Sequence, residues 1–240
     1  MATSLQDAIV VVIGGSSGIG LATAQLAAEA GARVTIVGRD EERLAAALEA
    51  LPAGSGGVSL DVANEGAVRD LFASFDHVDH VATLAGTHVA GTLAELDTEV
   101  LRGPMDNRFW GPLFVGKYAA PKMTTGSITL CTGAGVARPR AGNTIVTAAA
   151  GGSEFLARAM AVELAPVRVN VVRPGIIDTP LLDRLAAGLD RNDILQAMTK
   201  RVPLRRAGQP EEVADAILFL MTNEYVTGST LTIDGGASLA

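Results

Sequence analysis

A glycine-rich turn near the start of the chain restricts the fold more than any other feature. Residues 11–20, VVIGGSSGIG, directly follow an apolar strand pattern and directly open a helical one. Small residues there let the backbone approach a pyrophosphate, and the helix N-terminus offers free N–H groups. A turn without a ligand is the alternative, but its place between strand and helix favours a dinucleotide. The expected contacts in this turn are Gly14, Ser16, Ser17, Gly18, Ile19 and Gly20.

The rest of the chain alternates short β-branched runs with alanine-rich helical stretches. The expected strands are 8–13, 33–37, 57–60, 80–84, 126–131, 167–172 and 230–233. The expected helices are 18–30, 40–51, 65–74, 101–119, 148–165 and 210–221. This pattern predicts one α/β Rossmann domain over 1–240, a doubly wound parallel sheet of about seven strands covered by helices on both faces. Residues 181–206 break the alternation and are expected to form a helical lid near the substrate.

Composition narrows the functional classes. The chain has 240 residues, 48% of them hydrophobic, which suffices for one core without disulfides or a metal. A single cysteine, Cys131, excludes an internal disulfide and favours the cytoplasm. The net charge of -7 argues against nucleic acid as a partner. No targeting signal or apolar run of about 20 residues appears, so no membrane association is expected.

Further motifs follow along the chain. Asp61-Val62 comes after the third strand, 83–86 reads TLAG, Asn107 lies in the next helix, 173–180 reads RPGIIDTP and 234–236 reads DGG. Together with Gly14-x-x-x-Gly18-x-Gly20, they resemble the short-chain dehydrogenase/reductase family, which has TGxxxGxG, Asp-Val, NNAG and a Pro-Gly segment beside the nicotinamide. Ile13 stands at the Thr position, and both asparagines of NNAG are lost. The resemblance implies further cofactor contacts at Asp61, Val62, Ala85, Gly86, Pro174, Gly175, Ile177 and Thr179.

The end of the second strand bears on the choice of nucleotide. An acidic residue there pairs the ribose 2′-OH of NAD, whereas an arginine accepts the 2′-phosphate of NADP. The acidic position is Gly38, and Arg39 follows it. A guanidinium suits a phosphate by charge and by its forked donors. NADP(H) is therefore favoured over NAD(H), with an ordinary surface arginine as the alternative.

The family resemblance also implies a tyrosine that passes a proton to or from the substrate, a lysine that lowers the pKa of this tyrosine, and a serine that orients the substrate. The expected positions of these three residues carry other side chains in this chain. Counting back from the helix that follows the site, the tyrosine position is Val146, the lysine position is Ala150 and the serine position is Gly133. Tyr118 and Lys122 have the family's spacing, but they precede the fifth strand and Pro121 lies between them. They are not expected to be catalytic.

Other side chains are candidates to replace the missing groups. Thr132 adjoins the serine position, Asn107 matches the family's asparagine, and His88 lies in a loop that borders the nicotinamide in relatives. Histidine titrates near neutrality and could supply a proton; an exposed loop histidine is the alternative. His77 and His80 are expected to be structural, and Cys131 a small core residue. Arg138, Arg140 and Arg173 either bind a carboxylate or phosphate, or belong to a solvated loop with one helix-end ion pair.

Three functions remain open at this stage. The first is an NADP(H)-dependent oxidoreductase with a non-standard proton path, acting on a small carbonyl, imine or enone substrate. The second is a non-redox enzyme on the same scaffold: a cyclase, isomerase or dehydratase. The third is a catalytically silent binding or partner subunit. Family resemblance implies a homo-oligomer, a tetramer or dimer, and no metal is expected.

Overall fold

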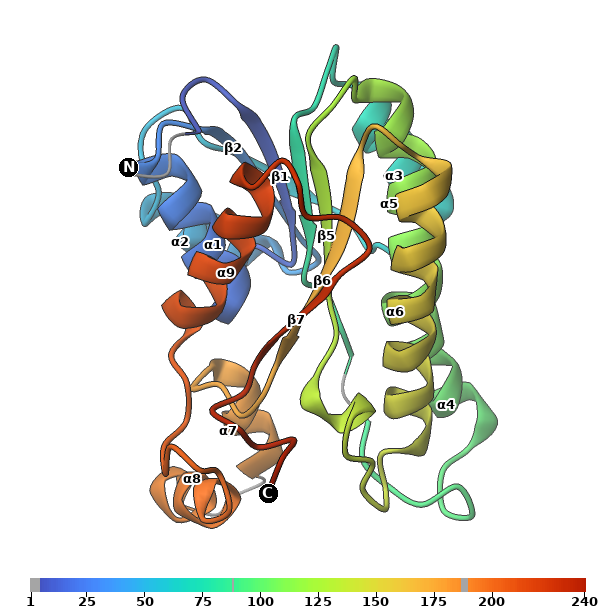
Figure 1. The fold of residues 1–240 in the computed structure, drawn as a ribbon, viewed down its shortest axis with the longest axis vertical. Helices are drawn as coiled ribbons and strands as arrows, with labels where there is room; N and C mark the ends of the chain where they lie inside the picture. Colours follow the sequence, from blue (N-terminus) through green and yellow to red (C-terminus); the bar gives the residue numbers. More distant parts are fainter. Residues whose placement is uncertain (1–4, 88, 187–189) are drawn as a thin grey trace.

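A parallel sheet of seven strands forms the centre of the computed structural model, in the order β3-β2-β1-β4-β5-β6-β7 (Figure 1). The structure describes residues 5–87, 89–186 and 190–240. The strands are β1 (Ile9–Ile13), β2 (Arg33–Gly38), β3 (Gly56–Ser59), β4 (His80–Thr83), β5 (Ser127–Cys131), β6 (Arg168–Pro174) and β7 (Thr230–Ile233). The strand order reverses between β1 and β4, which opens a crevice at the carboxyl ends of these strands. The predicted fold class is confirmed.

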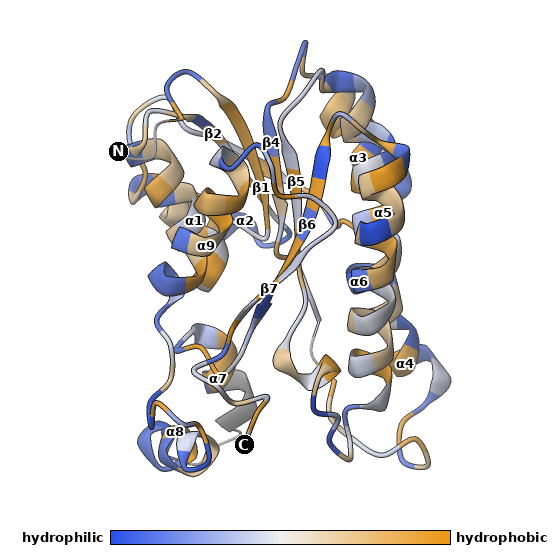
Figure 2. Cartoon of the chain, viewed as in Figure 1, coloured by the Kyte–Doolittle hydropathy of each residue, from blue (hydrophilic) through white to orange (hydrophobic). Residues whose placement is uncertain are grey.

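Helices cover both faces of the sheet (Figure 1). On one face lie α1 (Gly18–Glu29), α2 (Glu41–Glu49) and α9 (Pro210–Thr222). On the other lie α3 (Glu65–Ala73), α4 (Thr98–Met105), α5 (Gly111–Ala119) and α6 (Thr144–Glu163). Val10 and Val12 belong to the apolar core on the face covered by α1, α2 and α9. Val11 and Ile13 belong to the apolar core on the opposite face. Because successive side chains of a strand point to opposite faces, β1 must be apolar throughout. Figure 2 shows this hydrophobic run between the two helical layers.

The helix expected over 101–119 is interrupted in the structure. Between α4 and α5 lies a π-helical turn, Asp106–Trp110 (η1). Pro112 has no N–H, so it cannot donate to the carbonyl of Arg108 four residues earlier, and the regular ladder fails there. The hydroxyl of Ser153 in α6 donates to that carbonyl instead. The expectation of one continuous helix over 101–119 was wrong, because Pro112 interrupts the regular hydrogen-bond ladder.

Helix α6 begins at Thr144, four residues before the predicted start at Ala148. It is the one helix in the described part of the chain that is long and apolar enough to cross a membrane by length and composition. Such a signal is weak, because the core helix of a globular domain passes the same test. The buried residues Ala157, Met160 and Ala161 pack into the apolar core beneath the sheet.

The segment 181–206, of which the structure describes 181–186 and 190–206, contains helices as expected and ends in turns at 200–206. It contains most of α7 (Pro180–Ala186) and all of α8 (Arg191–Thr199). Arg191 holds the two helices together, donating to Asp178 at 2.5 Å and to Asp183 at 2.6 Å. The segment lies at the end of the molecule where the carboxyl ends of the strands are (Figure 1).

Candidate active site

A cleft of about 240 Å³ lies at the carboxyl ends of β1, β2 and β4. The sheet register brings the segments after these strands together. The Gly14 N–H donates to Val37 at 2.8 Å, and the Leu84 N–H donates to Ile13 at 2.7 Å. The cleft is therefore centred on the point where the strand order reverses, which is the usual ligand position in open α/β sheets.

The glycine-rich turn that borders this cleft has no room for a Cβ atom at Gly14 or Gly20. Gly14 has φ +86°, and a Cβ on it would lie 2.7 Å from the Ala85 nitrogen. A Cβ on Gly20 would lie 2.0 Å from the Gly14 carbonyl oxygen. Ser17, the N-cap of α1, makes no side-chain capping bond, so no cap competes for the first-turn N–H groups. These features fit a pyrophosphate against the helix N-terminus.

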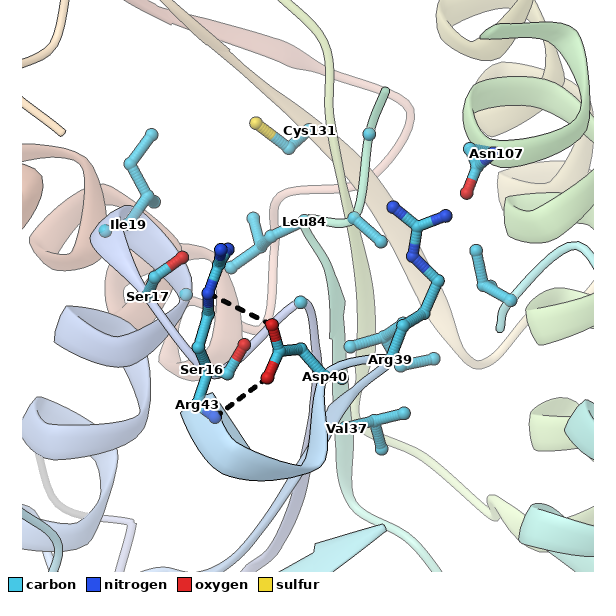
Figure 3. A pocket seen from close by; sticks show the side chains of 18 of the residues that line it. Ser16, Ser17, Ile19, Val37, Arg39, Asp40, Arg43, Leu84, Asn107 and Cys131 are labelled. Carbon is cyan, nitrogen blue, oxygen red and sulfur yellow. Dashed lines mark hydrogen bonds and ion pairs between the residues drawn. The ribbon is translucent and has the colours of Figure 1, made fainter. Parts of the chain in front are cut away.

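Arg39, Asp40 and Arg43 border the cleft after β2 (Figure 3), and Asp61 borders it after β3. Asp40 caps α2 by accepting from the Arg43 N–H at 3.0 Å, and it pairs with the Arg43 side chain at 3.2 Å. Arg39 points away from that pair and reaches Asp61 only at 3.4 Å, with 59% of its side chain exposed. Asp40 is thus neutralised locally, and Arg39 is the more available cation.

A second cavity of about 320 Å³ adjoins the cleft. Its walls come from the segments after β5 and β6, the first turns of α6, and α7 and α8. The residues that line both the cleft and the cavity are Ile19, Leu84, Gly86, Cys131, Thr179 and Leu181. A ligand in the cleft would therefore form part of the cavity wall. We call the first pocket the nucleotide cleft and the second the substrate cavity.

The sequence and the fold both match known proteins. The family model described as Enoyl-(Acyl carrier protein) reductase matches residues 13–238. The chain belongs to the short-chain dehydrogenase/reductase family. It is 33% identical to "Short-chain dehydrogenase/reductase ATR9" of Stachybotrys chlorohalonatus over 96% of each chain. It is 32% identical to human 3-oxoacyl-[acyl-carrier-protein] reductase over 97% of this chain and 99% of that one.

One solved structure is similar over nearly the whole chain. It is titled "Structure of MalC Reductase/Diels-Alderase from Malbranchea aurantiaca", is 32% identical, and has a TM-score of 0.91 over 98% of both chains. The relatives are named as reductases and dehydrogenases, which supports an oxidoreductase. Membership of the family implies a nicotinamide nucleotide as cofactor.

The residues predicted to contact the nucleotide all line one of the two pockets. Those in the nucleotide cleft are Gly14, Ser16, Ser17, Gly18, Ile19, Gly20, Arg39, Asp61, Val62, Ala85, Gly86 and Thr179. Those that line only the substrate cavity are Pro174, Gly175 and Ile177. The structure thus brings the set together at one edge of the sheet, and the individual contacts remain predictions.

One stripe of helix α6 faces the substrate cavity at its start. Val146 and Ala150, the positions counted for the family's tyrosine and lysine, are four residues apart and both line the cavity. Gly133, counted for the serine, lines it too. Among the described residues that line either pocket there is no tyrosine, lysine or histidine. At the two positions that the count assigns to the proton-transfer pair, the cavity wall presents the apolar side chains of Val146 and Ala150.

One turn further along the same stripe, Glu154 is buried in an ion pair. Arg173 at the end of β6 donates to its two carboxylate oxygens at 2.8 and 2.5 Å. The Thr132 hydroxyl donates to the same carboxylate at 3.0 Å. The bond to Glu154 raises the pKa of Arg173. Of the two interpretations of Arg173, the structure supports an ion pair, because Arg173 binds Glu154 and does not line the substrate cavity. The pair joins the end of β6 to the middle of α6, so the expected position at a helix end was wrong.

This pair also limits what Thr132 can do. Thr132 lines the cavity, but its side chain is buried and its proton is committed to the Glu154 carboxylate. As long as that bond is kept, its oxygen can only accept from a ligand. Thr132 therefore suits a structural bond behind the cavity better than proton donation.

The π-helical turn η1 holds Asn107 and Arg108, which face different pockets. Asn107 is buried, lines the nucleotide cleft and donates to the Gly103 carbonyl at 3.0 Å. Arg108 lines the substrate cavity and was not among the predicted site residues. The signal that could have revealed it is Pro112, whose missing N–H forces a local change of helical register and so redirects the side chains before it.

The remaining candidates are the three histidines and Cys131, and none of them is placed by the structure as a proton donor in either pocket. His88 lies outside the described residues. Cys131 is not only a core residue as expected, since it lines both pockets; burial raises the pKa of its thiol to about 11. His80 is buried against Ser127 at 2.9 Å, and burial lowers its pKa to about 4. His77 is exposed beside Asp79.

The Tyr118 and Lys122 side chains bind other groups outside both pockets. Tyr118 donates to Glu65 at 2.8 Å, and Lys122 donates to the Phe75 carbonyl at 2.8 Å. Neither lines the nucleotide cleft or the substrate cavity. Within the described residues, no group of three or more His, Cys, Asp or Glu could hold a metal ion.

Proposed function

We propose that the protein is an NADP(H)-dependent reductase that transfers hydride to an already activated carbonyl, imine or enone substrate without a tyrosine proton donor. The observation that carries this proposal is the apolar wall at Val146 and Ala150 beside an intact nucleotide cleft. The reduced nicotinamide supplies the hydride when bound. An activated substrate accepts it without prior protonation, so a general acid is not required for that step.

The preference for NADP(H) rests on the end of β2. Arg39 is half exposed and only loosely paired, whereas the nearby Asp40 carboxylate is neutralised by Arg43. A 2′-phosphate would find an available forked cation there. The glycine turn and the free N-terminus of α1 support the pyrophosphate of either nucleotide.

A calorimetric titration with NADPH and NADH tests the nucleotide. We expect NADPH to bind at micromolar concentration or tighter, and Arg39→Ala to weaken NADPH by about 10- to 100-fold, as loss of a charge-assisted hydrogen bond predicts. NADH binding should change little. Arg33→Ala is the matched control, since Arg33 is an exposed arginine at the other end of β2. Tighter binding of NADH than of NADPH by the unaltered protein would contradict the preference.

The cavity supports a bulky, mainly apolar substrate with an anionic substituent. The described lining includes Val136, Val146, Leu181, Leu182 and Met198. Arg138 and Arg140 line the same cavity and are the residues we assign to a carboxylate or phosphate at its rim. We assign the lid role to 181–206 on the same ground, because α7 and α8 both contribute to the wall.

A second candidate function is cyclisation in the same cavity. The apolar wall suits folding of a hydrophobic substrate, and the similar structure from Malbranchea aurantiaca is titled both reductase and Diels-Alderase. Stoichiometric oxidation of NADPH with substrate loss distinguishes reduction from cyclisation alone. No turnover of any substrate, with NADPH still bound, would favour the silent partner subunit instead.

We further propose a cytoplasmic homo-oligomer, a dimer or tetramer, that contacts through α6. Phe155 and Val162 lie seven residues apart on this helix and have exposures of 69% and 82%. Two such side chains on one helical face are suited to a partner helix. Light scattering should give a dimer or tetramer, and Val162→Glu should lower the mass. A monomer at micromolar concentration would contradict this.

A further inference from the structure

The charges around the substrate cavity are all of one sign. In the described lining, the charged side chains are Arg108, Arg138 and Arg140, and no aspartate or glutamate accompanies them. None of the three lies within ion-pair distance of a carboxylate of the described residues. This is unusual in a chain whose net charge is -7. The cavity is therefore arranged to meet negative charge.

Arg108 has the most defined position of the three. Its guanidinium packs on Gly86, where a Cβ would lie 2.8 Å from Cζ and 2.9 Å from Nη2. Gly86 lines both pockets, so this head group lies at the junction of the nucleotide cleft and the substrate cavity. Nε donates to the Thr87 carbonyl at 3.1 Å. The two terminal nitrogens have no hydrogen-bond partner within the part of the chain that the structure describes, so they remain available to a ligand.

The backbone around Arg108 is held from α6. Ser153 donates to the Arg108 carbonyl that Pro112 leaves without a helical donor. Gly152 leaves room for the ring of Phe109, which would lie 3.1 Å from a Cβ at that position. A cation fixed in this way needs little rearrangement when charge develops next to it. Burial lowers the pKa of Arg108, yet a guanidinium remains protonated at any physiological pH.

We propose that Arg108 is the oxyanion-binding residue of this reductase and that its substrate is a conjugated carbonyl compound. This inference rests on the proposed hydride transfer and specifies its substrate class. Hydride adds to the β-carbon, the C=C electron pair shifts toward the carbonyl, and the C=O electron pair moves onto oxygen. The resulting enolate oxygen accepts hydrogen bonds from Arg108. Its α-carbon later takes a proton from water, which completes the reduction of the C=C bond.

The same charges disfavour one of the other activated substrates. An iminium ion is already positive and would enter a cavity lined by three arginines. Hydride transfer neutralises that ion, so the arginines would stabilise neither its ground state nor its product. A conjugated carbonyl is neutral at first and becomes negative during the transfer. Arg108 then binds the transition state more strongly than the substrate, which is the requirement for rate acceleration.

The ionisation of bound 4-nitrophenol tests this assignment without turnover. The phenolate is coloured and carries its charge on a conjugated oxygen, as the enolate does. Absorbance is titrated against pH with protein in excess, with and without saturating NADP⁺. In the unaltered protein, the bound phenol should ionise at a lower pH than in water. Arg108→Gln should raise that pH by about one unit or more, a ten-fold change in the proton equilibrium.

Two further variants complete the test. Arg33→Gln makes the same change of charge at an exposed position far from the cavity, and the ionisation should match that of the unaltered protein. Gly86→Ala keeps the charge but displaces the guanidinium, and it should raise the ionisation pH in the same direction as Arg108→Gln. If Arg108→Gln fails to fold, Gly86→Ala still tests whether the position of the guanidinium controls the ionisation.

Each result has a defined meaning. Failure of the phenol to bind, or an ionisation that neither Arg108→Gln nor Gly86→Ala alters, would overturn the proposal. The titration without NADP⁺ tests the oxyanion site independently of nucleotide binding, on which the proposed function depends. If NADP⁺ does not bind but Arg108 still controls the ionisation, the reductase proposal fails and the oxyanion site stands. If NADP⁺ binds and Arg108 has no effect on the ionisation, the oxyanion site fails and the reductase proposal stands.

Discussion

The nucleotide cleft and the substrate cavity share a wall but are built differently. The cleft is formed mainly by backbone: the glycines after β1, the free first turn of α1 and the ends of β2 and β4. The cavity lies between the segments after β5 and β6, and its chemistry comes from the side chains that η1, α6, α7 and α8 add to its wall. A site made of backbone depends on the fold itself, whereas a site made of side chains can change its chemistry while the fold stays. Four predictions test this contrast.

The largest effect is expected on NADPH affinity, from a substitution in the glycine-rich turn of the nucleotide cleft. Gly20→Val should weaken NADPH binding by more than about 1000-fold, because even a Cβ would lie 2.0 Å from the Gly14 carbonyl oxygen. Calorimetry measures the change. Gly103→Ala is the control, since nothing lies within 4 Å of a Cβ there. Micromolar binding by Gly20→Val would show that the turn tolerates side chains and that the contrast is false.

Behind the cavity, the buried ion pair should have the next largest effect. Glu154→Gln leaves Arg173 charged and largely buried, with 19% of its side chain exposed. Loss of one partner of such a pair typically costs about 3–5 kcal/mol of unfolding free energy. Urea denaturation measures it. The double variant Glu154→Gln with Arg173→Met should be more stable than the single one; equal stability would show that the charges are not coupled.

Side-chain chemistry should be replaceable in the cavity. Val146→Tyr with Ala150→Lys should raise NADPH-dependent reduction of a simple ketone such as cyclohexanone by about 100-fold or more, the usual contribution of general acid catalysis. Val146→Phe with Ala150→Met fills similar space without an acid and should give no gain. NADPH affinity should stay within about two-fold in both. No gain from the first variant would mean that more than these two residues separates this cavity from a ketone reductase.

The smallest effect is expected at the edge of the sheet opposite both pockets. Burial lowers the pKa of His80 to about 4 from an unfolded value of 6.5. The unfolded chain therefore binds the proton first, and stability present above pH 6.5 is lost as the pH falls toward 4. Between pH 6.5 and 5 the loss is roughly 1–2 kcal/mol. Denaturation midpoints should show it, and His80→Asn should remove this part of the slope without altering NADPH binding. An unchanged slope would contradict the assignment.

The sequence predicts the backbone-built region well. The turn at 11–20 needs glycine for steric reasons, and continuous apolar strands need a helix layer on each face, so both can be inferred from residue type and order. The predicted cofactor residues accordingly lie around one edge of the sheet. The positions of Val146 and Ala150 followed from counting back along the family resemblance, and the count reaches the cavity because α6 continues without interruption to Thr144.

The side-chain-built region could be predicted only in part. The direction of Arg108 depends on the π-helical turn, and that turn depends on Pro112 together with Ser153, which lies 41 positions further along the sequence. Arg173 was open between two roles because its partner, Glu154, lies on another element. Helix register and pairing between distant elements are tertiary properties, which local patterns do not encode.

The shared wall has a kinetic consequence. Gly86, Cys131 and Thr179 each line both pockets. The wall of the substrate cavity is therefore complete only when the nucleotide is bound in its cleft. We therefore expect a compulsory order, with the nucleotide first to enter and last to leave. Product-inhibition patterns would then be competitive between the two nucleotide forms and mixed for every other pair. The six residues that the two pockets share would then set the order in which nucleotide and substrate bind.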